Sequence, residues 1–327
     1  MNKFTIKIVA AALLLALPLC FATLAEAQKV YRIGSLNSAE QFVGSFEGFK
    51  SRMVELGYVE GRNVRYDFYN AKGSNEALDS FAKKMVQDKT DLIVTSSTSA
   101  TVFAAKATAG TNIPVVFLSA GNAQILVKNF ASSGSNIAGI SSASMEITGK
   151  RFELLKEMAP WVKRIALITD PKGVNYKSIV TEIGDAAKKI KFTVWEVRVS
   201  SQEEILQVVP TVTQKATDAI FTPPDSLVTE GIDIIVKHSI KERLPVITSL
   251  VDNIKKGCLA TYAADYFSLG RQGAVLADKI FKGTKPSDLP VELPSKLKLV
   301  LNLNTAKAIG LKIPREILLR ADEVIEQ

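Results

Sequence analysis

The sequence predicts an α/β protein made of two doubly wound, parallel-sheet lobes that are joined by a hinge. Short β-branched runs alternate with stretches of helical hydrophobic spacing, which is typical of parallel strands linked by right-handed crossovers. The alternation runs through residues 30–117 and begins again near residue 149. A chain of 327 residues fits about two domains, and no long Pro/Ser-rich linker separates the halves.

The first series of units comprises four predicted strands with helices between them. Between residues 40 and 56 the apolar residues recur at helical spacing, and Gly57 is a stop signal for that helix. The strands are expected at 30–35, 63–68, 91–95 and 113–117, and the helices at 40–56, 75–87 and 99–106.

The second series opens with an almost continuously apolar run, Arg164-Ile165-Ala166-Leu167-Ile168-Thr169, as expected for a strand covered on both faces of its sheet. Ser201 and Glu204 have the spacing of a helix capping box. The strands are expected at 164–169, 192–197, 218–222, 244–248, 257–262 and 297–301, and the helices at 150–158, 175–189, 201–215, 230–243 and 268–281.

The N-terminus has the pattern of a secretory signal peptide spanning residues 1–27. Lys3 and Lys7 precede an uncharged apolar run, and Ala25-Glu26-Ala27 is an A-x-A cleavage pattern. An uncleaved membrane anchor is the first alternative, because residues 8–25 are 18 apolar positions. Lipid attachment at Cys20 is the second, although Leu19 stands where such signals carry a small residue. We therefore expect export to a periplasm.

The charge distribution, the Cys and His content and the absence of known enzyme motifs each exclude a class of function. The net charge is +8, but Lys and Arg are spread along the chain, so no nucleic-acid partner is expected. Cleavage of the signal would leave Cys258 alone, and His238 is the single histidine, so neither a disulfide nor a Cys/His metal site is expected. The sequence lacks the glycine-rich nucleotide motifs and the G-x-S-x-G elbow, so we expect no cofactor and no enzyme activity.

Polar residues cluster where the predicted strands end. In open parallel sheets, ligands bind beyond the carboxyl ends of the strands. The residues there that we predict to bind a ligand are Ser35, Asn37, Ser96, Ser97, Thr98, Ser119, Asp170, Asp225 and Thr248.

The two halves offer opposite chemistry at these ends. Residues 96–99 open a helix, where free N–H groups and the helix dipole favour an anion such as a carboxylate. Asp170 and Asp225 lie in the other half and suit an ammonium group. This combination predicts a zwitterion such as an amino acid. The alternative is that these residues are only helix caps, since Ser, Thr and Asp are preferred there.

Three C-terminal segments carry a family resemblance. Residues 278–292, 301–311 and 320–326 resemble the ABC-transporter substrate-binding proteins of the tryptophan/tyrosine type (TrpX-like). The resemblance implies a type I periplasmic binding protein fold with a three-strand hinge and a cleft that closes on a solute. It places an N-terminal lobe at 28–143 plus 264–288 and a C-terminal lobe at 144–263 plus 289–327.

The same resemblance implies particular site residues. Ser96, Ser97 and Thr98 match the family's serine/threonine turn, and Asp225 matches an acidic or amide position of the second lobe. Tyr262 and Asp265 match its hinge motif. The chain departs from the family pattern at residues 122–124, where Asp-Pro-Val is usual, and at Ala263, where glycine is usual. The ligand's identity is therefore not carried over from the family.

We interpret the sequence as a monomeric periplasmic solute-binding protein that feeds an ABC permease in the inner membrane. Its solute would be an amino acid or related carboxylate, with an aromatic one among the candidates. A ligand-sensing module for a membrane receptor and an exported α/β enzyme are the alternatives. A DNA-binding regulator of this fold would need an N-terminal helix-turn-helix where the signal stands.

Overall fold

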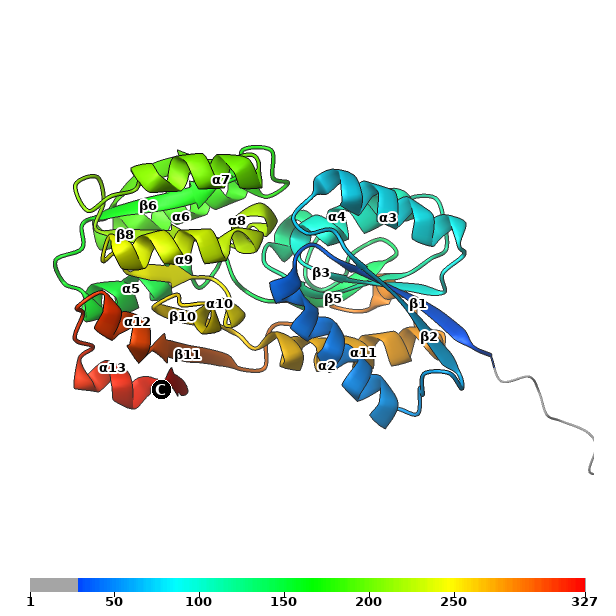
Figure 1. The fold of residues 1–327 in the computed structure, drawn as a ribbon. Coiled ribbons are helices and arrows are strands. Elements are labelled where there is room, and N and C mark those ends of the chain that lie inside the picture. The colour runs from blue at the N-terminus through cyan, green and yellow to red at the C-terminus, as the bar shows by residue number, and fades with distance from the viewer. Residues whose placement is uncertain (1–28, 327) are drawn as a thin grey trace, which may run out of the picture.

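The computed structural model describes residues 29–326 and contains two α/β lobes that lie side by side (Figure 1). The N-terminal lobe has a five-stranded parallel sheet in the order β2-β1-β3-β4-β5. Its strands are β1 (Tyr31–Asn37), β2 (Val64–Asn70), β3 (Leu92–Ser96), β4 (Val115–Ala120) and β5 (Ile137–Ser141).

Helices cover both faces of this sheet, as the unbroken burial of β3, β4 and β5 requires. One face packs against α2 (Val43–Glu55) and α11 (Tyr266–Phe281), and the other against α3 (Asn75–Gln87) and α4 (Thr98–Thr108). Helices α2 and α11 touch through glycine, because a Cβ on Gly270 would lie 1.7 Å from the carbonyl oxygen of Ser45. A helix from the C-terminal part of the chain thus completes the N-terminal lobe.

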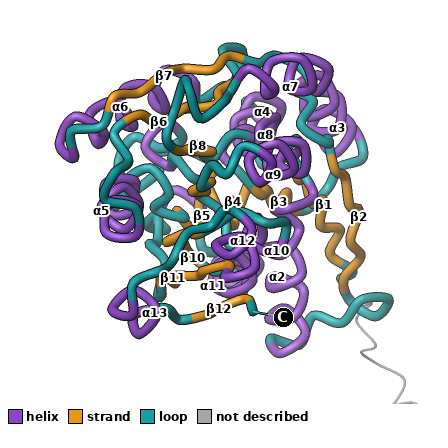
Figure 2. The backbone as a smooth tube through the Cα atoms, turned by 60° about the vertical axis from the view of Figure 1, so that its left-hand side comes forward, coloured by secondary structure: helices purple, strands orange, loops and turns teal. Residues whose placement is uncertain are grey.

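The C-terminal lobe has a seven-stranded sheet in the order β12-β11-β10-β9-β8-β6-β7. Its strands are β6 (Arg164–Thr169), β7 (Thr193–Arg198), β8 (Ala219–Thr222), β9 (Val246–Thr248), β10 (Ala260–Ala264), β11 (Leu297–Asn302) and β12 (Glu323–Ile325). One face carries α5 (Thr148–Met158), α6 (Tyr176–Ile190), α12 (Leu303–Ala308) and α13 (Arg315–Arg320). The other carries α7 (Gln202–Val208), α8 (Ser226–Glu230), α9 (Ile232–Lys241) and α10 (Asp252–Lys255) (Figure 2).

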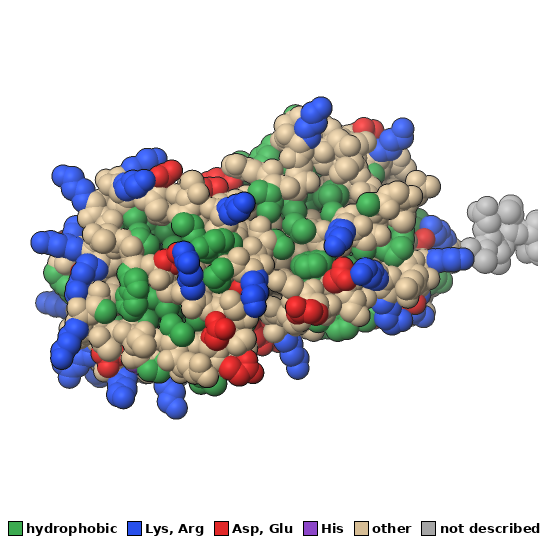
Figure 3. Space-filling view, turned by 90° about the horizontal axis from the view of Figure 1, so that it is seen from above, with side chains coloured by type: hydrophobic (Ala, Val, Ile, Leu, Met, Phe, Trp, Pro, Cys, Tyr) green, Lys and Arg blue, Asp and Glu red, His purple; other side chains and the backbone are tan. Residues whose placement is uncertain are grey.

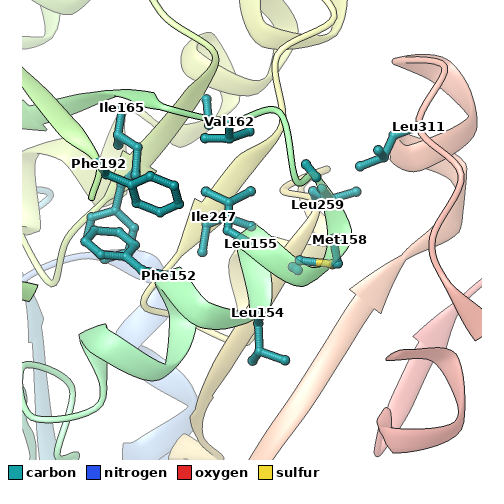
Figure 4. Packing of buried hydrophobic residues seen from close by; sticks show 14 of the residues in the cluster. Phe152, Leu154, Leu155, Met158, Val162, Ile165, Phe192, Ile247, Leu259 and Leu311 are labelled. Carbon is teal, nitrogen blue, oxygen red and sulfur yellow. The ribbon is translucent and has the colours of Figure 1, made fainter. Parts of the chain in front are cut away.

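Phe152 on α5 is at the centre of the larger core cluster of this lobe (Figure 4). Its ring meets those of Phe192 and Phe221 edge-on, at centroid distances of 5.6 and 5.1 Å. Edge-on contacts suit the charge distribution of aromatic rings and add to the stabilisation from apolar burial. This packing fixes the sheet whose strand ends face the other lobe.

The structure confirms the predicted α/β class and corrects several elements. Strand β11 runs antiparallel to β10, because β10 leaves for the N-terminal lobe and β11 returns from it. The sequence pattern missed β5, in which Gly139 packs directly on Phe117, and the short β12. The helix expected at 201–215 ends early near Pro210, and the one expected at 230–243 is divided at Gly231 into α8 and α9.

Within the described residues, the chain crosses between the lobes three times. The first crossing is residues 142–147, the second is Asp265, and the third is residues 293–296. The third crossing begins later than the sequence suggested: residues 289–292 still pack on the N-terminal lobe, where Val291 N–H donates to the Phe130 carbonyl at 2.8 Å and Glu292 N–H to that of Gly139 at 3.0 Å. The other lobe boundaries stay a prediction.

The expected signal peptide, including Cys20, lies outside the described residues. Among residues 29–326, none of the helices has the length and apolar character needed to cross a membrane.

Candidate functional site

The carboxyl ends of the parallel strands of both sheets face one another between the lobes (Figure 1). The lobes touch there: a Cβ on Gly121 would lie 3.0 Å from Cβ of Pro224, and one on Gly73 would lie 3.5 Å from Cα of Leu227. A narrow cleft between them is lined from both sides, by Gly73, Asn75 and Ser99 of the N-terminal lobe and by Asp170 and residues 173–175 and 225–227 of the other.

Buried polar atoms without a partner concentrate at these facing edges. Buried polar groups in proteins almost always form hydrogen bonds, so side-chain atoms without a protein partner can donate to or accept from a ligand or water. Ten such side-chain atoms occur among the described residues, and eight belong to segments at the strand ends. They are Asn37 Oδ1, Ser38 Oγ, Ser119 Oγ and Asn122 Nδ2 in the N-terminal lobe, and Asn175 Oδ1, Thr222 Oγ1, Ser249 Oγ and Asn253 Oδ1 in the C-terminal lobe.

The N-terminal side of the cleft is organised by the start of helix α4. Ser97 caps this helix by accepting the Ala100 N–H at 3.2 Å, and its φ of 100° is strained for a residue with a side chain. Such strain is concentrated at functional sites. Thr98 Oγ1 accepts the Asn122 N–H at 3.0 Å, which ties the end of β3 to the end of β4. The arrangement presents a helix N-terminus of the kind that binds anions.

The C-terminal side carries two buried carboxylates. Asp225 caps α8 by accepting the Val228 N–H at 3.1 Å, and its other oxygen accepts the Asp170 N–H at 3.3 Å. Asp170 accepts the Lys172 N–H at 2.8 Å. Neither carboxylate forms an ion pair with a residue of the described chain 29–326, although both are more than nine-tenths buried.

Burial dominates the electrostatics of this pair. Desolvation raises the pKa of Asp225 to about 6, with a smaller contribution from the negative charge of Asp170. Desolvation likewise raises the pKa of Asp170 above its ordinary value. Among residues 29–326, Asp225 has no counter-cation, and Asp170 has only the charge of Lys172 nearby, with which it forms no ion pair, so the pair is ready to receive a cation from a ligand.

The remaining predicted residues of the strand ends are also buried at these edges. Ser35 accepts a hydrogen bond from Asn37 Nδ2 at 2.9 Å, and Ser96 Oγ lies 2.7 Å from Ser45 Oγ on α2. Thr248 Oγ1 accepts from Asn253 Nδ2 at 3.0 Å. These groups therefore hold the neighbouring polar side chains in place.

Tyr262 and Asp265 lie apart from this set, at the second crossing. The half-buried Tyr262 packs beside the larger core cluster of the C-terminal lobe. Asp265 caps α11 by accepting the Ser268 N–H at 2.8 Å and pairs with Lys298 Nζ at 2.8 Å. Ligand contact by these two residues stays a prediction.

The predicted set of ligand-binding residues left out six residues that carry unpartnered buried atoms: Ser38, Asn122, Asn175, Thr222, Ser249 and Asn253. Ser38, Asn122 and Ser249 belong to the polar strand ends that the sequence pattern identified, and Thr222 ends β8, so all four had a local signal. Asn175 and Asn253 lie at helix starts after loops, and no sequence pattern placed them at the cleft.

The histidine and the cysteine of the described chain lie away from the cleft. His238 Nε2 is 2.9 Å from the Val212 carbonyl oxygen, and Cys258 is fully buried among apolar residues that raise the pKa of its thiol. Within residues 29–326, no three His, Cys, Asp or Glu side chains are grouped closely enough to hold a metal ion.

Two α/β lobes, three crossings and polar strand ends that face each other define the type I periplasmic binding protein fold. A family model described as ABC transporter substrate binding protein matches residues 37–325. The chain belongs to this family.

Three relatives agree with this assignment. A protein named tyrosine-binding protein from Clostridioides difficile (strain R20291) is 31% identical over 273 residues, which are 81% of this chain and 76% of the relative. The ABC domain in complex with L-Trp from Streptococcus pneumonia is 28% identical, with a TM-score of 0.82 over 91% of this chain and 100% of that one. The ligand-free, open structure of a substrate-binding protein with adhesive properties from Clostridium difficile is also 28% identical over the same shares, with a TM-score of 0.64.

The two solved relatives differ in how well they superpose. Both are 28% identical to this chain, yet the complex with L-Trp gives a TM-score of 0.82 and the open, ligand-free structure 0.64. The close approach of the lobes at Gly121 and Gly73, where a Cβ would lie 3.0 and 3.5 Å from the opposite lobe, agrees with this order. The lobes are thus in an arrangement close to that of the ligand-bound relative.

Proposed function

We propose that this protein captures an amino acid, of the aromatic class named for its relatives, between its lobes and delivers it to an ABC permease. The observation that carries the ligand class is the buried Asp170–Asp225 pair, which has no cationic partner in the described chain and faces the N-terminus of α4. One lobe supplies acceptors for an ammonium group, and the other supplies donors for a carboxylate.

The proposed contacts follow from the geometry of each lobe. The ammonium group binds Asp225, whose two oxygens accept backbone hydrogen bonds and keep acceptor capacity for a further donor. The carboxylate binds the hydroxyls and free N–H groups at Ser97 and Thr98. Because the two charges are held by different lobes, the ligand stabilises the closed arrangement over the open one.

Location and partners follow from the family. Substrate-binding proteins of ABC importers work outside the cytoplasm, and we propose that residues 1–27 direct this chain to a periplasm. On the face seen in Figure 3, Lys and Arg side chains are distributed over both lobes with Asp and Glu among them, so we propose no nucleic-acid partner. We also propose that the protein is a monomer. Membership of the transporter family favours a permease over a sensor kinase as the membrane partner, and favours binding over catalysis.

A thermal-shift screen tests the proposed ligand class. A ligand that binds only the folded protein raises its melting temperature. We expect L-tryptophan, L-tyrosine or another α-amino acid to raise it, and the matching amine and deaminated acid to raise it far less. A screen in which only ligands lacking one of the two charges act would reject the proposal.

Ligand affinity should fall in acid because Asp225 titrates near pH 6. The protonated carboxyl cannot pair with an ammonium group, so affinity falls about tenfold for each pH unit below that pKa. We expect roughly tenfold weaker binding by calorimetry at pH 5 than at pH 7. Equal affinities at the two pH values would show that Asp225 does not hold the ammonium.

The stability of the ligand-free protein should change in the opposite sense. The folded-state pKa of Asp225 lies above the ordinary aspartate value of 3.8, so the folded state binds this proton more tightly than the unfolded state. This group therefore adds stability as pH falls from about 6 towards 4. Thermal unfolding of the ligand-free protein over this range separates the two effects.

A further inference from the structure

Arg151 is a buried cation at the hinge that the ligand contacts above do not use. It lies in the first turns of α5, and its side chain is among the largest fully buried ones in the described chain, with 1% exposure. A buried guanidinium normally has an acidic partner, because an isolated charge is costly to desolvate. Arg151 forms no ion pair with the described residues, and burial lowers its pKa to about 10.

Its hydrogen bonds go to the two crossings that begin the hinge. Nη1 donates to the Ser144 carbonyl oxygen at 2.6 Å, and Nη2 donates to Ser144 Oγ at 3.3 Å. Nε donates to the Tyr262 carbonyl oxygen at 2.9 Å. Ser144 belongs to the first crossing, and Tyr262 is on β10, which leads into the second. One side chain thus joins the C-terminal-lobe ends of two crossings.

The residue before Ser144 is conformationally strained. Ala143 has a φ of 50°, in the left-handed region that a residue with a Cβ rarely adopts. Its N–H donates to Ser141 Oγ at 3.0 Å. Ser144 also lies at the cleft, since its Cβ would be 3.5 Å from a Cβ on Gly121. The strain is therefore located between the Arg151 contact and the end of β5.

We propose that Arg151 is a positioning residue of the hinge, which joins the first two crossings and holds Ala143 in its left-handed conformation while the lobes are closed. The proposal rests on the lobe closure described above. Opening would relax Ala143, so the strain favours the open arrangement, and ligand binding must overcome it. Arg151 opposes the strain by fixing Ser144.

The distance between the lobes in the ligand-free protein tests this role. Spin labels can be placed by Lys83→Cys on α3 and Lys189→Cys on α6, which are both exposed and lie on opposite lobes. Cys258 is fully buried and should not react with the label. Pulsed electron spin resonance then gives the distance distribution of the mature protein, before and after addition of L-tryptophan.

Two variants should move this distribution in opposite directions. Arg151→Met should shift the ligand-free population to longer distances and weaken L-tryptophan binding about tenfold. Ala143→Gly should shift it to shorter distances and tighten binding by about fivefold, because glycine adopts a positive φ without strain. Since Ala143→Gly removes a strain rather than a contact, it tests the proposal even where Arg151→Met folds poorly.

Arg164→Met is the matched control in the same lobe. Arg164 is bound by Asp218 at 2.7 Å and by the carbonyl oxygens of Lys215 and Gln214, away from the crossings. Arg164→Met should lower the melting temperature without changing the distances between the two spin labels. Unchanged distances and affinity in Ala143→Gly, or an Arg164→Met distribution identical to that of Arg151→Met, would overturn the proposal.

Different results would show that the hinge role of Arg151 is wrong and that the ligand assignment of Asp225 is wrong. Asp225→Asn should weaken L-tryptophan binding by about 100-fold or more while leaving the ligand-free distance distribution as in the parent protein. A hinge variant that alters this distribution therefore supports the role of Arg151 whichever solute the cleft binds.

Discussion

Asp225→Asn is expected to weaken amino-acid binding by at least about 100-fold. The carboxylate is fully buried and has no cation in the described fold, so its charge-assisted contact with the ligand ammonium forms in a desolvated site. Truncating one partner of such a buried charged pair costs about 2–5 kcal/mol, which is roughly 30-fold to several thousand-fold in affinity, and the nearly complete burial of Asp225 places its loss in the upper part of this range. Titration calorimetry with L-tryptophan or L-tyrosine measures the loss.

The same change should not destabilise the ligand-free protein. Burial raises the pKa of Asp225 to about 6, so keeping it charged at neutral pH costs roughly 3 kcal/mol at most. Asparagine removes this charge and can still cap α8 through its side-chain oxygen. The ligand-free melting temperature is therefore expected to hold or rise while binding is lost.

Asn302→Ala provides the matched control for a lost cap. Asn302 caps α12 by accepting the Thr305 N–H at 2.9 Å, in the same lobe. Alanine also removes the hydrogen bond that Asn302 Nδ2 donates to the Ile254 carbonyl oxygen at 2.9 Å, so we expect a cost of about 2–3 kcal/mol in stability and an unchanged affinity. If Asp225→Asn bound the ligand as tightly as the parent protein, the ammonium assignment would be wrong.

Gly121→Val should hold the lobes apart. A Cβ at this position would lie 3.0 and 3.3 Å from Cβ and Cγ of Pro224 in the opposite lobe, and valine adds two further methyl groups. Overpacking of this kind costs about 1–3 kcal/mol when the neighbours cannot move, but lobes on a hinge can move apart. We therefore expect affinity to fall about 10- to 100-fold while the folded protein keeps its stability.

Small-angle scattering shows whether Gly121→Val prevents the lobes from closing or damages the protein in some other way. The radius of gyration of Gly121→Val should stay at its ligand-free value when L-tryptophan is added at a concentration that compacts the parent protein. Gly184→Val on α6 is the control, because no atom lies within 4 Å of a Cβ there. Full compaction and parent-like affinity in Gly121→Val would show that this contact does not limit closure.

An element of the fold could be predicted where its own stretch of sequence carries the pattern of that element. The apolar run of β6 identified a buried parallel strand, because both faces of that sheet are covered. Strand β5 was hidden by Gly139, whose close approach to Phe117 is a tertiary requirement that no local pattern displays. The antiparallel β11 was hidden for a similar reason, since its direction is set by where the chain re-enters the lobe.

In the candidate site too, residues with a local sequence signal could be predicted, and residues placed by tertiary packing could not. The placement of Ser97 and Asp225 at the cleft could be predicted, because Ser97 directly follows β3 and Asp225 lies three residues after the end of β8. The alternative that they cap helices is confirmed, since both accept the backbone N–H three residues later, and their contact with a ligand stays a prediction. Capping uses only part of their acceptor capacity, so it does not exclude ligand binding. Asn175 and Asn253 reach the edge through tertiary packing and had no such signal.

The most direct test of the proposed site compares two ligands on two proteins by calorimetry. L-tryptophan and its deaminated analogue, indole-3-propionate, differ in the ammonium group that Asp225 is proposed to hold. We expect loss of the ammonium to weaken binding by at least about 100-fold in the parent protein and by only a few-fold in Asp225→Asn, since the coupled pair is already broken there. An equal loss in both proteins would contradict the account.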